Sequence, residues 1–167
     1  IIYYPYLSGS GAPLPDPQMR GALIGLRTEH GKADLLKAIL EGTAYEMEAI
    51  RRAAARVATD AIEQFVAVGG GTRNQTWMRI KATVSDCTIL IPPIEEATLL
   101  GAALLAAIGM GIFQDATEAV ASLDFKADSQ VVTPCPITKE RYRQIFEEGY
   151  LILQHPIRQY FQTAGQE

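Results

Sequence analysis

An apolar segment that ends in three consecutive glycines is the feature that most constrains the fold. Residues 65–68 read Phe-Val-Ala-Val and run directly into Gly69, Gly70 and Gly71. A short apolar run that stops at a glycine cluster predicts a buried strand followed by a tight turn. A helix is expected over residues 74–85, and the free N–H groups and positive dipole end at its start favour phosphate or another anion. This turn is the one place where the residues suggest chemistry.

The glycines alone leave two interpretations open. The turn lacks the Gly-Lys-Ser/Thr of a P-loop, and Asn74 stands where the dinucleotide fingerprint G-x-G-x-x-G has its last glycine. Either the glycines let the backbone approach a nucleotide without Cβ contacts, or they only allow the strand and the helix to pack closely. Asn74 likewise either lies near a nucleotide or serves only as the helix N-cap, a role that Thr72 could also take.

Strand and helix patterns alternate along the chain, which predicts an α/β domain with at least part of its sheet parallel. Only two or three strands are expected, so helix should dominate. Apart from the segments above, the expected elements are a possible strand at 1–4 followed by irregular loop, a helix at 32–58, strands at 62–68 and 87–91, a helix from Glu96 to Ile108, a short helix from Asp115 to Ser122, a loop at 125–136, and a helix capped by Thr138 and ended by Pro156.

The helix expected over residues 32–58 carries apolar residues at alternating spacings of three and four. Such a stripe could line a partner groove, but packing against a sheet is the favoured interpretation. The stripe consists of Leu36, Ile39, Thr43, Met47, Ile50, Ala54 and Val57.

The helix that begins near Glu95 and Glu96 is apolar on every face over residues 97–108, so other elements should cover it. The paired carboxylates could form an acid/base or metal site. The favoured interpretation is structural, because a helix N-terminus stabilises acidic side chains.

Composition excludes several classes of function. The 167 residues suit one domain, and the hydrophobic fraction of 48% suffices for a core. A net charge of −4 argues against nucleic-acid and membrane partners, and the longest apolar run is shorter than the ~20 residues of a membrane span. Cys87 and Cys135 show no metal or redox spacing, and His30 and His155 are isolated. We therefore expect a cytoplasmic protein and predict no metal ligand in this chain.

Several motifs in order resemble the C-terminal domain of the FGGY carbohydrate kinases. That family shows a strand, Gly-Gly-Gly, a small residue, a variable residue, Ser or Asn, and then an aromatic residue. This chain matches with residues 69–74 and Trp77, and the family's later Leu-Gly-Ala-Ala corresponds to residues 100–103. Upstream, residues 4–9 resemble Pro-Tyr-Leu-Ser-Gly, and residues 16–21 resemble Asp-Pro-x-x-Arg-Gly.

The resemblance implies part of an actin-like, ribonuclease-H-like ATPase domain, helix-rich with a few buried, partly parallel strands. It assigns residues 1–155 to a nucleotide-binding domain that is incomplete at its N-terminal side, and residues 156–167 to a tail. It also implies a full-length enzyme that transfers a phosphoryl group from ATP, with Mg²⁺, to a sugar or polyol hydroxyl. The residues that it places near the nucleotide are Gly69, Gly70, Gly71, Asn74 and Gln75.

The catalytic aspartate and the sugar-binding residues of the family lie in an N-terminal domain that no segment here matches. We therefore predict no catalytic residue in this chain, and we expect the missing domain as a partner, together with a possible homodimer. Two alternatives stay open: a non-catalytic binding or assembly module that retains the fold, and a nucleotide-sensing regulator.

Overall fold

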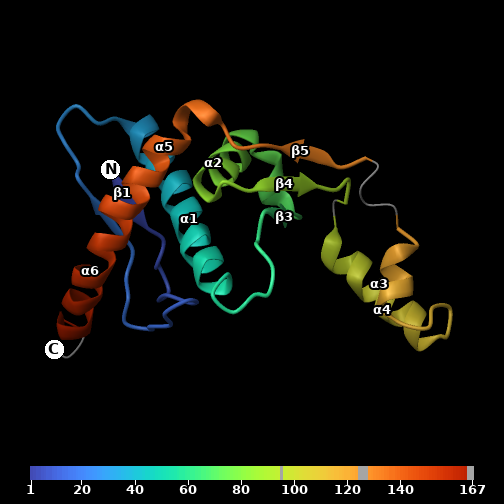
Figure 1. The fold of residues 1–167 in the computed structure, drawn as a ribbon. Coiled ribbons are helices and arrows are strands. Elements are labelled where there is room, and N and C mark those ends of the chain that lie inside the picture. Colours follow the sequence, from blue (N-terminus) through green and yellow to red (C-terminus); the bar gives the residue numbers. More distant parts are fainter. Residues whose placement is uncertain (95, 124–127, 165–167) are drawn as a thin grey trace.

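The computed structural model describes residues 1–94, 96–123 and 128–164. Hairpin β1–β2, helices α1, α5 and α6 lie at one end, α2 and strands β3–β5 lie in the middle, and α3 and α4 lie at the other end (Figure 1). The elements are β1 (Ile2–Tyr4), β2 (Ala22–Ile24), α1 (Lys32–Ala54), β3 (Gln64–Val66), the 3₁₀ turn η1 (Gly70–Arg73), α2 (Gln75–Ser85), β4 (Thr88–Ile91), α3 (Ala97–Gly109), α4 (Ala116–Ala121), β5 (Gln130–Val132), α5 (Pro136–Gln144), the π-helical turn η2 (Ile145–Tyr150) and α6 (Leu151–Ala164).

The strands form two small sheets. β1 and β2 pair antiparallel, with Tyr3 opposite Leu23. The second sheet has the order β3-β4-β5: β3 and β4 run parallel, with Phe65 paired to Ile89, while β5 runs antiparallel to β4. The predicted α/β class with a partly parallel sheet is therefore confirmed, and helix dominates.

A tyrosine core joins the two ends of the chain. Tyr4 and Tyr150 are fully buried and stack with ring centroids 4.5 Å apart, and the Tyr4 hydroxyl donates to the carbonyl oxygen of Tyr150 at 2.5 Å. The Tyr6 and Tyr150 hydroxyls each donate to the same carboxylate oxygen of Glu46 at 2.7 Å. These contacts link β1, α1 and the C-terminal helical segment over more than 100 residues of sequence.

A second, smaller core lies between α2 and one face of the β3–β5 sheet. Met78 and Ala82 of α2 pack against Ile89 and Val132, and Phe65 adds to the cluster. The opposite side of α2 contributes residues to the tyrosine core and packs against α1. Helix α2 is therefore the shared wall between the two cores.

The predicted apolar stripe of α1 is wrong. Leu36, Ile39, Ile50 and Val57 are exposed, whereas the buried positions are Ala38, Gly42, Ala44, Tyr45, Glu48 and Ala49. Small residues set this face, because a Cβ on Gly42 would overlap the carbonyl oxygen of Tyr3. The buried Glu48 carboxylate is neutralised by Arg51 and Arg52, each of which reaches a Glu48 oxygen at 2.7 Å. The helix also ends at Ala54 rather than at residue 58.

The C-terminal predictions need three corrections. Helix α5 begins at Pro136 with Cys135 as its N-cap, so Thr138 is not the cap. Pro156 does not end the helix, because α6 continues to Ala164. The expected loose tail is therefore helical as far as residue 164, although the assignment of residues 1–155 to one domain stays a prediction.

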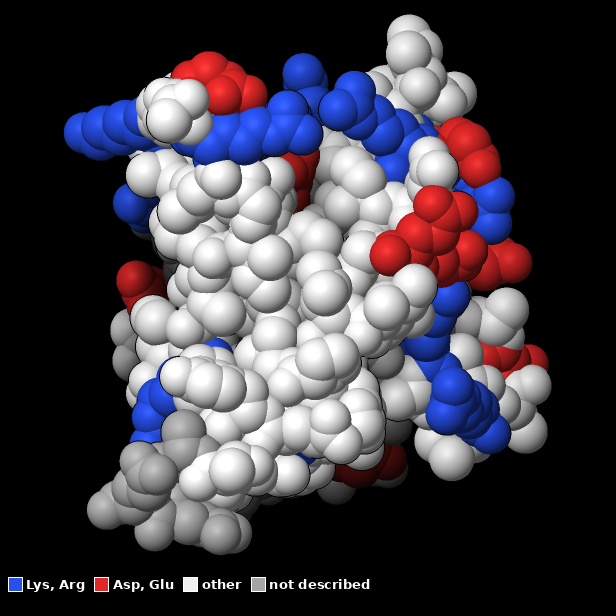
Figure 2. Space-filling view, turned by 90° about the vertical axis from the view of Figure 1, so that its left-hand side faces the viewer, with Lys and Arg blue, Asp and Glu red and all other residues white. Residues whose placement is uncertain are grey.

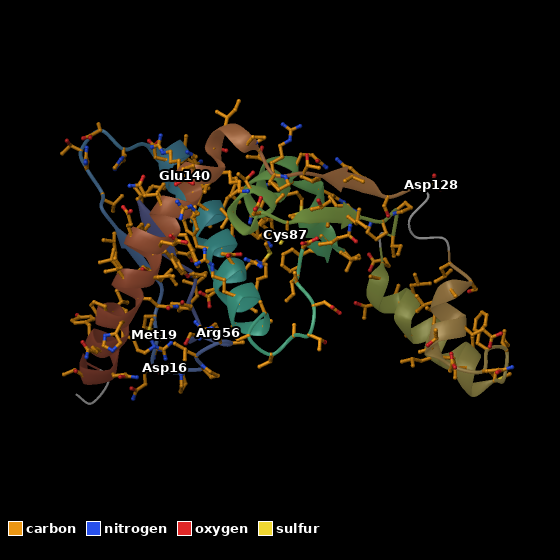
Figure 3. All side chains as sticks on the ribbon, in the orientation of Figure 1. Asp16, Met19, Arg56, Cys87, Asp128 and Glu140 are labelled. Atoms are coloured by element: carbon orange, nitrogen blue, oxygen red, sulfur yellow. The ribbon has the colours of Figure 1, made fainter. Side chains whose placement is uncertain are left out.

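Contacts with the N-terminal loop hold α6 in place beyond Pro156. Proline removes one helical hydrogen bond, but Arg158 and Gln162 both bond to the Asp16 carboxylate, at 3.1 and 2.8 Å. Arg158 also donates to the carbonyl oxygen of Leu14 at 2.9 Å. Asp16 and Met19 lie near the lower half of α6 in Figure 3.

Two strands were not predicted. β2 lies in the segment expected as irregular loop, and β5 lies within the expected loop at 125–136, part of which falls outside the described residues. Both strands have only three residues, which is too short for an alternating pattern to be distinctive. The predicted strand at 62–68 is likewise shortened to Gln64–Val66.

Helix α3 has no buried residue. It packs against α4, and both project away from the rest of the molecule (Figure 1). The sequence predicts that other elements cover the apolar surface of this helix. The described residues do not provide that cover. Glu95 lies outside those residues. Within them, no helix combines the length and apolarity that a membrane span requires.

Candidate functional site

The glycine turn connects β3 to α2, as predicted. Gly69 has φ +89° and ψ 177°, and the chain then makes the 3₁₀ turn η1. The Thr72 hydroxyl and backbone N–H both donate to the carbonyl oxygen of Gly69, at 2.8 and 3.1 Å. Thr72 thus closes the turn and is not the helix cap. The tight turn brings the start of α2 directly beside the end of a parallel strand, where α/β sheets usually bind ligands.

The structure requires glycine at two of the three positions, for different reasons, and not at the third. Gly69 has a positive φ, which only glycine adopts without strain. A Cβ on Gly71 would come within 2.9 Å of the Trp77 ring, so packing accounts for this residue. Gly70 has neither constraint: its φ is not positive, and a Cβ there would meet nothing within 4 Å. The space beside Gly70 is open, so this is the position where a ligand could approach the backbone.

Asn74 caps α2. Its Oδ1 accepts the backbone N–H of Trp77 at 3.0 Å, which satisfies one of the orphan donors of the first turn. Within the described parts of the chain, its amide nitrogen donates no hydrogen bond. The cap and ligand interpretations therefore use different atoms of the same side chain.

Gln75 pairs with Gln130 of β5. The two amides exchange hydrogen bonds of 3.1 and 2.9 Å, so Gln75 ties the start of α2 to the edge of the sheet. Both residues line a polar pocket of about 390 Å³ that also contains Arg79. The structure therefore brings Gln75 to the same end of α2 as the glycine turn, and adds Gln130, which lies on a strand that the sequence did not predict.

The segment that carries the glycine turn is locally basic. Residues 64–85 contain Arg73, Arg79 and Lys81 and no acidic residue, in a chain whose net charge is −4. No acidic side chain lies in the first turn of α2. This local excess of positive charge suits an anion. A charge count over short stretches of the sequence would have shown it, whereas the net charge of the whole chain did not.

Trp77 connects the turn to the rest of the fold. Its ring packs against Gly71, its indole N–H donates to the Thr43 hydroxyl of α1 at 2.9 Å, and Lys81 lies over the ring at 4.1 Å from the centroid. Burial lowers the pKa of Lys81. The turn is thereby anchored to α1 as well as to the sheet.

An apolar groove of about 360 Å³ lies next to the turn, between the sheet and α3. It extends along β3 to Val68, the residue directly before Gly69. Its lining includes Val66, Leu90, Leu100 and Leu104. The glycine turn thus separates this apolar groove from the polar pocket at Gln75.

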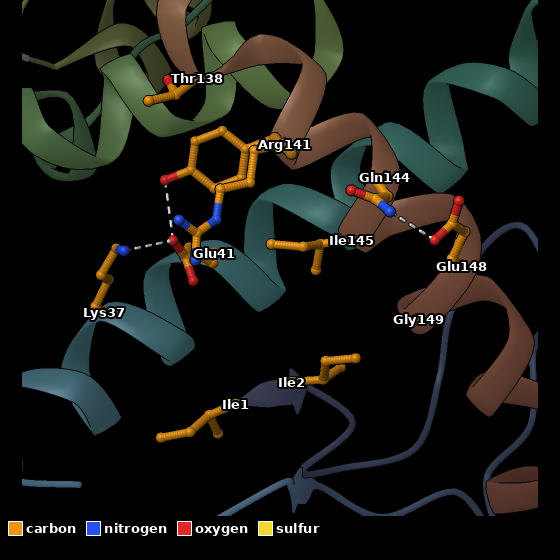
Figure 4. A pocket seen from close by; sticks show the side chains of 11 residues that line it. Ile1, Ile2, Lys37, Glu41, Thr138, Arg141, Gln144, Ile145, Glu148 and Gly149 are labelled. Carbon is orange, nitrogen blue, oxygen red and sulfur yellow. Dashed lines mark hydrogen bonds and ion pairs between the residues drawn. The ribbon is translucent and has the colours of Figure 1, made fainter.

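A pocket of about 580 Å³ between α1 and α5 is a weaker candidate (Figure 4). Several of its polar groups pair with one another: Lys37 pairs with Glu41 at 3.3 Å, and the Tyr142 hydroxyl donates to Glu41 at 2.9 Å. None of its lining residues belongs to the glycine turn. No chemistry is therefore assigned to this pocket.

The other polar candidates have structural explanations. Glu96 is an exposed N-cap without a side-chain cap bond. Cys87 is buried between α1 and the sheet (Figure 3), its thiol faces the carbonyl oxygen of Ile62 at 3.1 Å, and burial raises its pKa. His30 accepts a backbone N–H within a turn. Among the described residues, no group of three His, Cys, Asp or Glu side chains could hold a metal ion.

Comparison with known proteins identifies the class. The model of the FGGY family of carbohydrate kinases, C-terminal domain, matches residues 1–110. The chain is 30% identical over 148 residues to the xylulose kinase of Bacillus subtilis (strain 168), which covers 88% of this chain and 29% of that kinase. It is 28% identical over 150 residues to glycerol kinase 1 of Thermotoga maritima, which covers 90% and 30%.

Solved structures agree in fold. A ligand-bound xylulose kinase from Lactobacillus acidophilus matches with a TM-score of 0.80 at 22% identity, over 97% of this chain and 32% of that one. The xylulose kinase from Rhodospirillum rubrum matches with a TM-score of 0.72 at 27% identity, over 96% and 31%.

The fold is therefore that of an actin-like ATPase domain, seen in part. The chain belongs to the FGGY family of carbohydrate kinases and contains residues of its C-terminal domain. It spans less than a third of the length of each of these four relatives.

Proposed function

We propose that the full-length protein transfers the γ-phosphoryl group of ATP to a hydroxyl of a sugar or polyol, and that this chain supplies one wall of the ATP site. Membership of the FGGY family supports the reaction class. The observation that carries the location is the open space beside Gly70, a glycine that neither backbone conformation nor packing requires. The turn also lies at the start of a helix, where exposed N–H groups favour anions.

The residues of this chain fit a nucleotide in three ways. The backbone at Gly70 allows close approach, because no side chain intervenes. Asn74 holds the first turn of α2 with its oxygen and presents its amide NH₂ to an acceptor atom of the base. Arg73 and Arg79 add positive charge that favours the phosphates.

The remaining parts of the reaction fall to the rest of the kinase. ATP supplies the phosphoryl group, and Mg²⁺ held by its phosphates neutralises charge in the transition state. We assign no residue of this chain to proton transfer, sugar binding or metal ligation. Closure of a second domain over the glycine turn would exclude water and complete the site. The isolated chain should therefore bind nucleotide weakly and catalyse no transfer.

Isothermal titration of the chain with Mg-ATP and Mg-ADP tests the location. Valine at position 70 places a branched side chain where the nucleotide must approach, so Gly70→Val should weaken binding by about tenfold or more, or ~1.4 kcal/mol. Gly109→Val is the matched control, because Gly109 also has open space around its Cβ position and no positive φ. Gly71→Val is less informative, since it would displace Trp77.

Several outcomes would count against the proposal. Binding that survives Gly70→Val would remove the nucleotide from the turn. Sugar phosphorylation by the purified chain would contradict the assignment of proton transfer and sugar binding to the rest of the kinase. A full-length protein that binds no nucleotide would favour a non-catalytic module with a kinase fold.

We further propose a cytoplasmic location and a homodimeric kinase. The dimer rests on analogy with the family alone. The location rests on the composition and the cysteine spacing of the chain. Light scattering of the full-length protein would test the dimer, and cell fractionation would test the location.

A further inference from the structure

Strand β5 leaves one of its two edges unpaired. In the order β3-β4-β5, it pairs only with β4 among the described residues (Figure 1). An unpaired edge exposes backbone N–H and C=O groups, which natural proteins usually protect with lysine, proline, a bulge or a covering element. Residues 130–133 read Gln-Val-Val-Thr and contain neither lysine nor proline. The sequence of β5 therefore leaves this edge open to an added strand.

The register of the sheet identifies the backbone groups that face this edge. The N–H of Thr88 and the carbonyl oxygen of Leu90 bond to the β3 side, at 3.0 and 2.8 Å. Backbone groups point to alternate sides along a strand, so those of Ile89 face β5, where Ile89 pairs with Val132. Val131 lies opposite Leu90, and its N–H and carbonyl oxygen consequently point away from β4.

The polar pocket of about 390 Å³ lies along the same strand, on the side of α2. It is lined by Gln75 and Arg79 of α2 and by residues 130–135. Val132 faces α2, and Gln130 lies on the same side because it is two residues earlier in the strand. Residues directly opposite each other on paired strands share a face. Alternate side chains of a strand added to β5 would therefore lie over this pocket.

Arg79 determines which side chain the pocket favours. Its guanidinium is exposed and forms no hydrogen bond or ion pair with the described residues. The amides of Gln75 and Gln130 already bond to each other. The described lining contains no acidic residue. A guanidinium presents its donors in a fork that matches a carboxylate, so the pocket suits an aspartate or glutamate side chain.

We propose that the free edge of β5 and the adjoining pocket bind an extended acidic peptide segment of another protein. The segment pairs with the backbone of Val131 and directs alternate carboxylate side chains toward Arg79. A second copy of the chain does not meet this requirement through β5, because residues 130–133 carry no carboxylate. The proposal does not rest on the position of the ATP site.

Fluorescence anisotropy of a labelled peptide with the full-length protein, without nucleotide, tests the proposal. In the probe, valine and glutamate alternate, and in the control peptide lysine replaces glutamate. The acidic peptide should bind at least about fivefold more tightly than the basic one. Val131→Pro removes the outward N–H and no bond to β4, so it should weaken binding by about fivefold or more. Val131→Thr is the matched control, because it keeps the N–H and should retain binding.

Substitutions at Arg79 test the charge. Arg79→Gln should weaken binding of the acidic peptide by about twofold to fivefold, and Arg79→Lys should weaken it less. Arg56→Gln is the matched control and should have no effect, because Arg56 is another exposed arginine and lies far from β5 in Figure 3. Gly70→Val, which tests the ATP site, should leave peptide binding unchanged. Failure of the ATP site can therefore be distinguished from failure of this proposal.

Several results would overturn the proposal. They are the absence of acidic-peptide binding up to about 1 mM, equal affinity for the two peptides, and unchanged binding to both Val131→Pro and Arg79→Gln. Unfolding of Val131→Pro, measured by circular dichroism, would contradict the free N–H. A dimer that Val131→Pro converts to a monomer in light scattering would make a second copy the occupant of the edge.

Discussion

The tyrosine core and the β3–β5 sheet differ in how completely they bury their apolar side chains. In the tyrosine core, Tyr4, Tyr45, Phe146 and Tyr150 are at most 1% exposed, and segments from both ends of the chain surround them. On the other side of α2, Val66 of β3 and Val131 of β5 are 65% and 56% exposed, and α3 has no buried residue. One region buries its aromatic side chains almost completely, and the other leaves aliphatic side chains such as Val66 and Leu105 exposed.

The two regions also differ in their buried polar groups. Hydroxyl–carboxylate bonds to Glu46 fix the relative positions of β1, α1 and the C-terminal helical segment. Buried polar networks of this kind specify one arrangement when every member is satisfied. The outer side of the sheet at Val66, Leu90 and Val131, and most of α3, are aliphatic instead. Figure 2 shows that the side of the molecule near α6 is also largely free of charged residues, with Lys, Arg, Asp and Glu gathered at its margins.

The largest effect should come from truncating the centre of the tyrosine core. Phe146→Ala removes a ring that is 1% exposed and should lower the free energy of unfolding by ~3–5 kcal/mol. Leu105→Ala in α3, where the side chain is 69% exposed, should change it by less than about 0.5 kcal/mol in the isolated chain. Urea denaturation measures both. Similar losses would show that the two regions are equally packed.

The same substitution in two helices should have opposite signs. Gly42→Ala in α1 forces a Cβ onto the carbonyl of Tyr3 and should destabilise by roughly 1–3 kcal/mol. Gly101→Ala in α3 meets nothing within 4 Å and should stabilise by up to about 1 kcal/mol, through helix propensity alone. Thermal unfolding followed by circular dichroism distinguishes them. A destabilising Gly101→Ala would mean that α3 is already closely packed in the isolated chain.

A smaller effect is expected at the helix cap. Asn74→Ala removes the acceptor for the Trp77 N–H and should cost about 1 kcal/mol. Asn74→Asp keeps a cap oxygen and should retain that stability, while it removes the NH₂ that we assign to the base. Chemical denaturation and nucleotide titration of both variants therefore separate the two roles. If neither variant loses nucleotide affinity, Asn74 serves only as the helix cap.

The smallest effect concerns Asp16 at low pH. The backbone N–H of Gln18, the Gln162 amide and Arg158 lower the pKa of this carboxyl below its usual 3.8. A depressed folded-state pKa stabilises the protein above the unfolded pKa, and that contribution disappears as the pH falls through the folded pKa. The difference in melting temperature between the wild type and Asp16→Asn should therefore shrink below pH 3.8. A difference that stays constant down to pH 2 would contradict this assignment.

The parts of the fold that the sequence predicted correctly are those that local signals determine. The run from Phe65 through the three glycines to the Asn74 cap is contiguous, and each residue acts on its neighbours. Asp115 is another such case: its side chain accepts the N–H of Glu118, as the capping-box pattern predicts. Family resemblance then supplied the fold, and the comparison confirmed it.

The failures have non-local causes. The buried face of α1 follows the approach of Tyr3 to Gly42 and the pairing of Glu48, neither of which appears in a count of apolar residues. Helix α6 passes Pro156 because Asp16, distant in sequence, binds its last turns. The different structural requirements at the three glycines could not be predicted from the sequence either. They depend on the positive φ of Gly69 and on the Trp77 ring that lies against Gly71. The roles of Gly69, Gly70, Gly71, Asn74 and Gln75 in nucleotide binding stay predictions.

The position of Trp77 gives the protein a built-in optical probe. It is the only tryptophan of the chain, and it contacts the glycine turn, α1 and Lys81. Any event that shifts Gly71 or loosens α2 from α1 must alter the surroundings of this single indole. The emission spectrum can therefore follow events at the turn without a label, whereas α3 and α4 contain no tryptophan and are silent at the same wavelength.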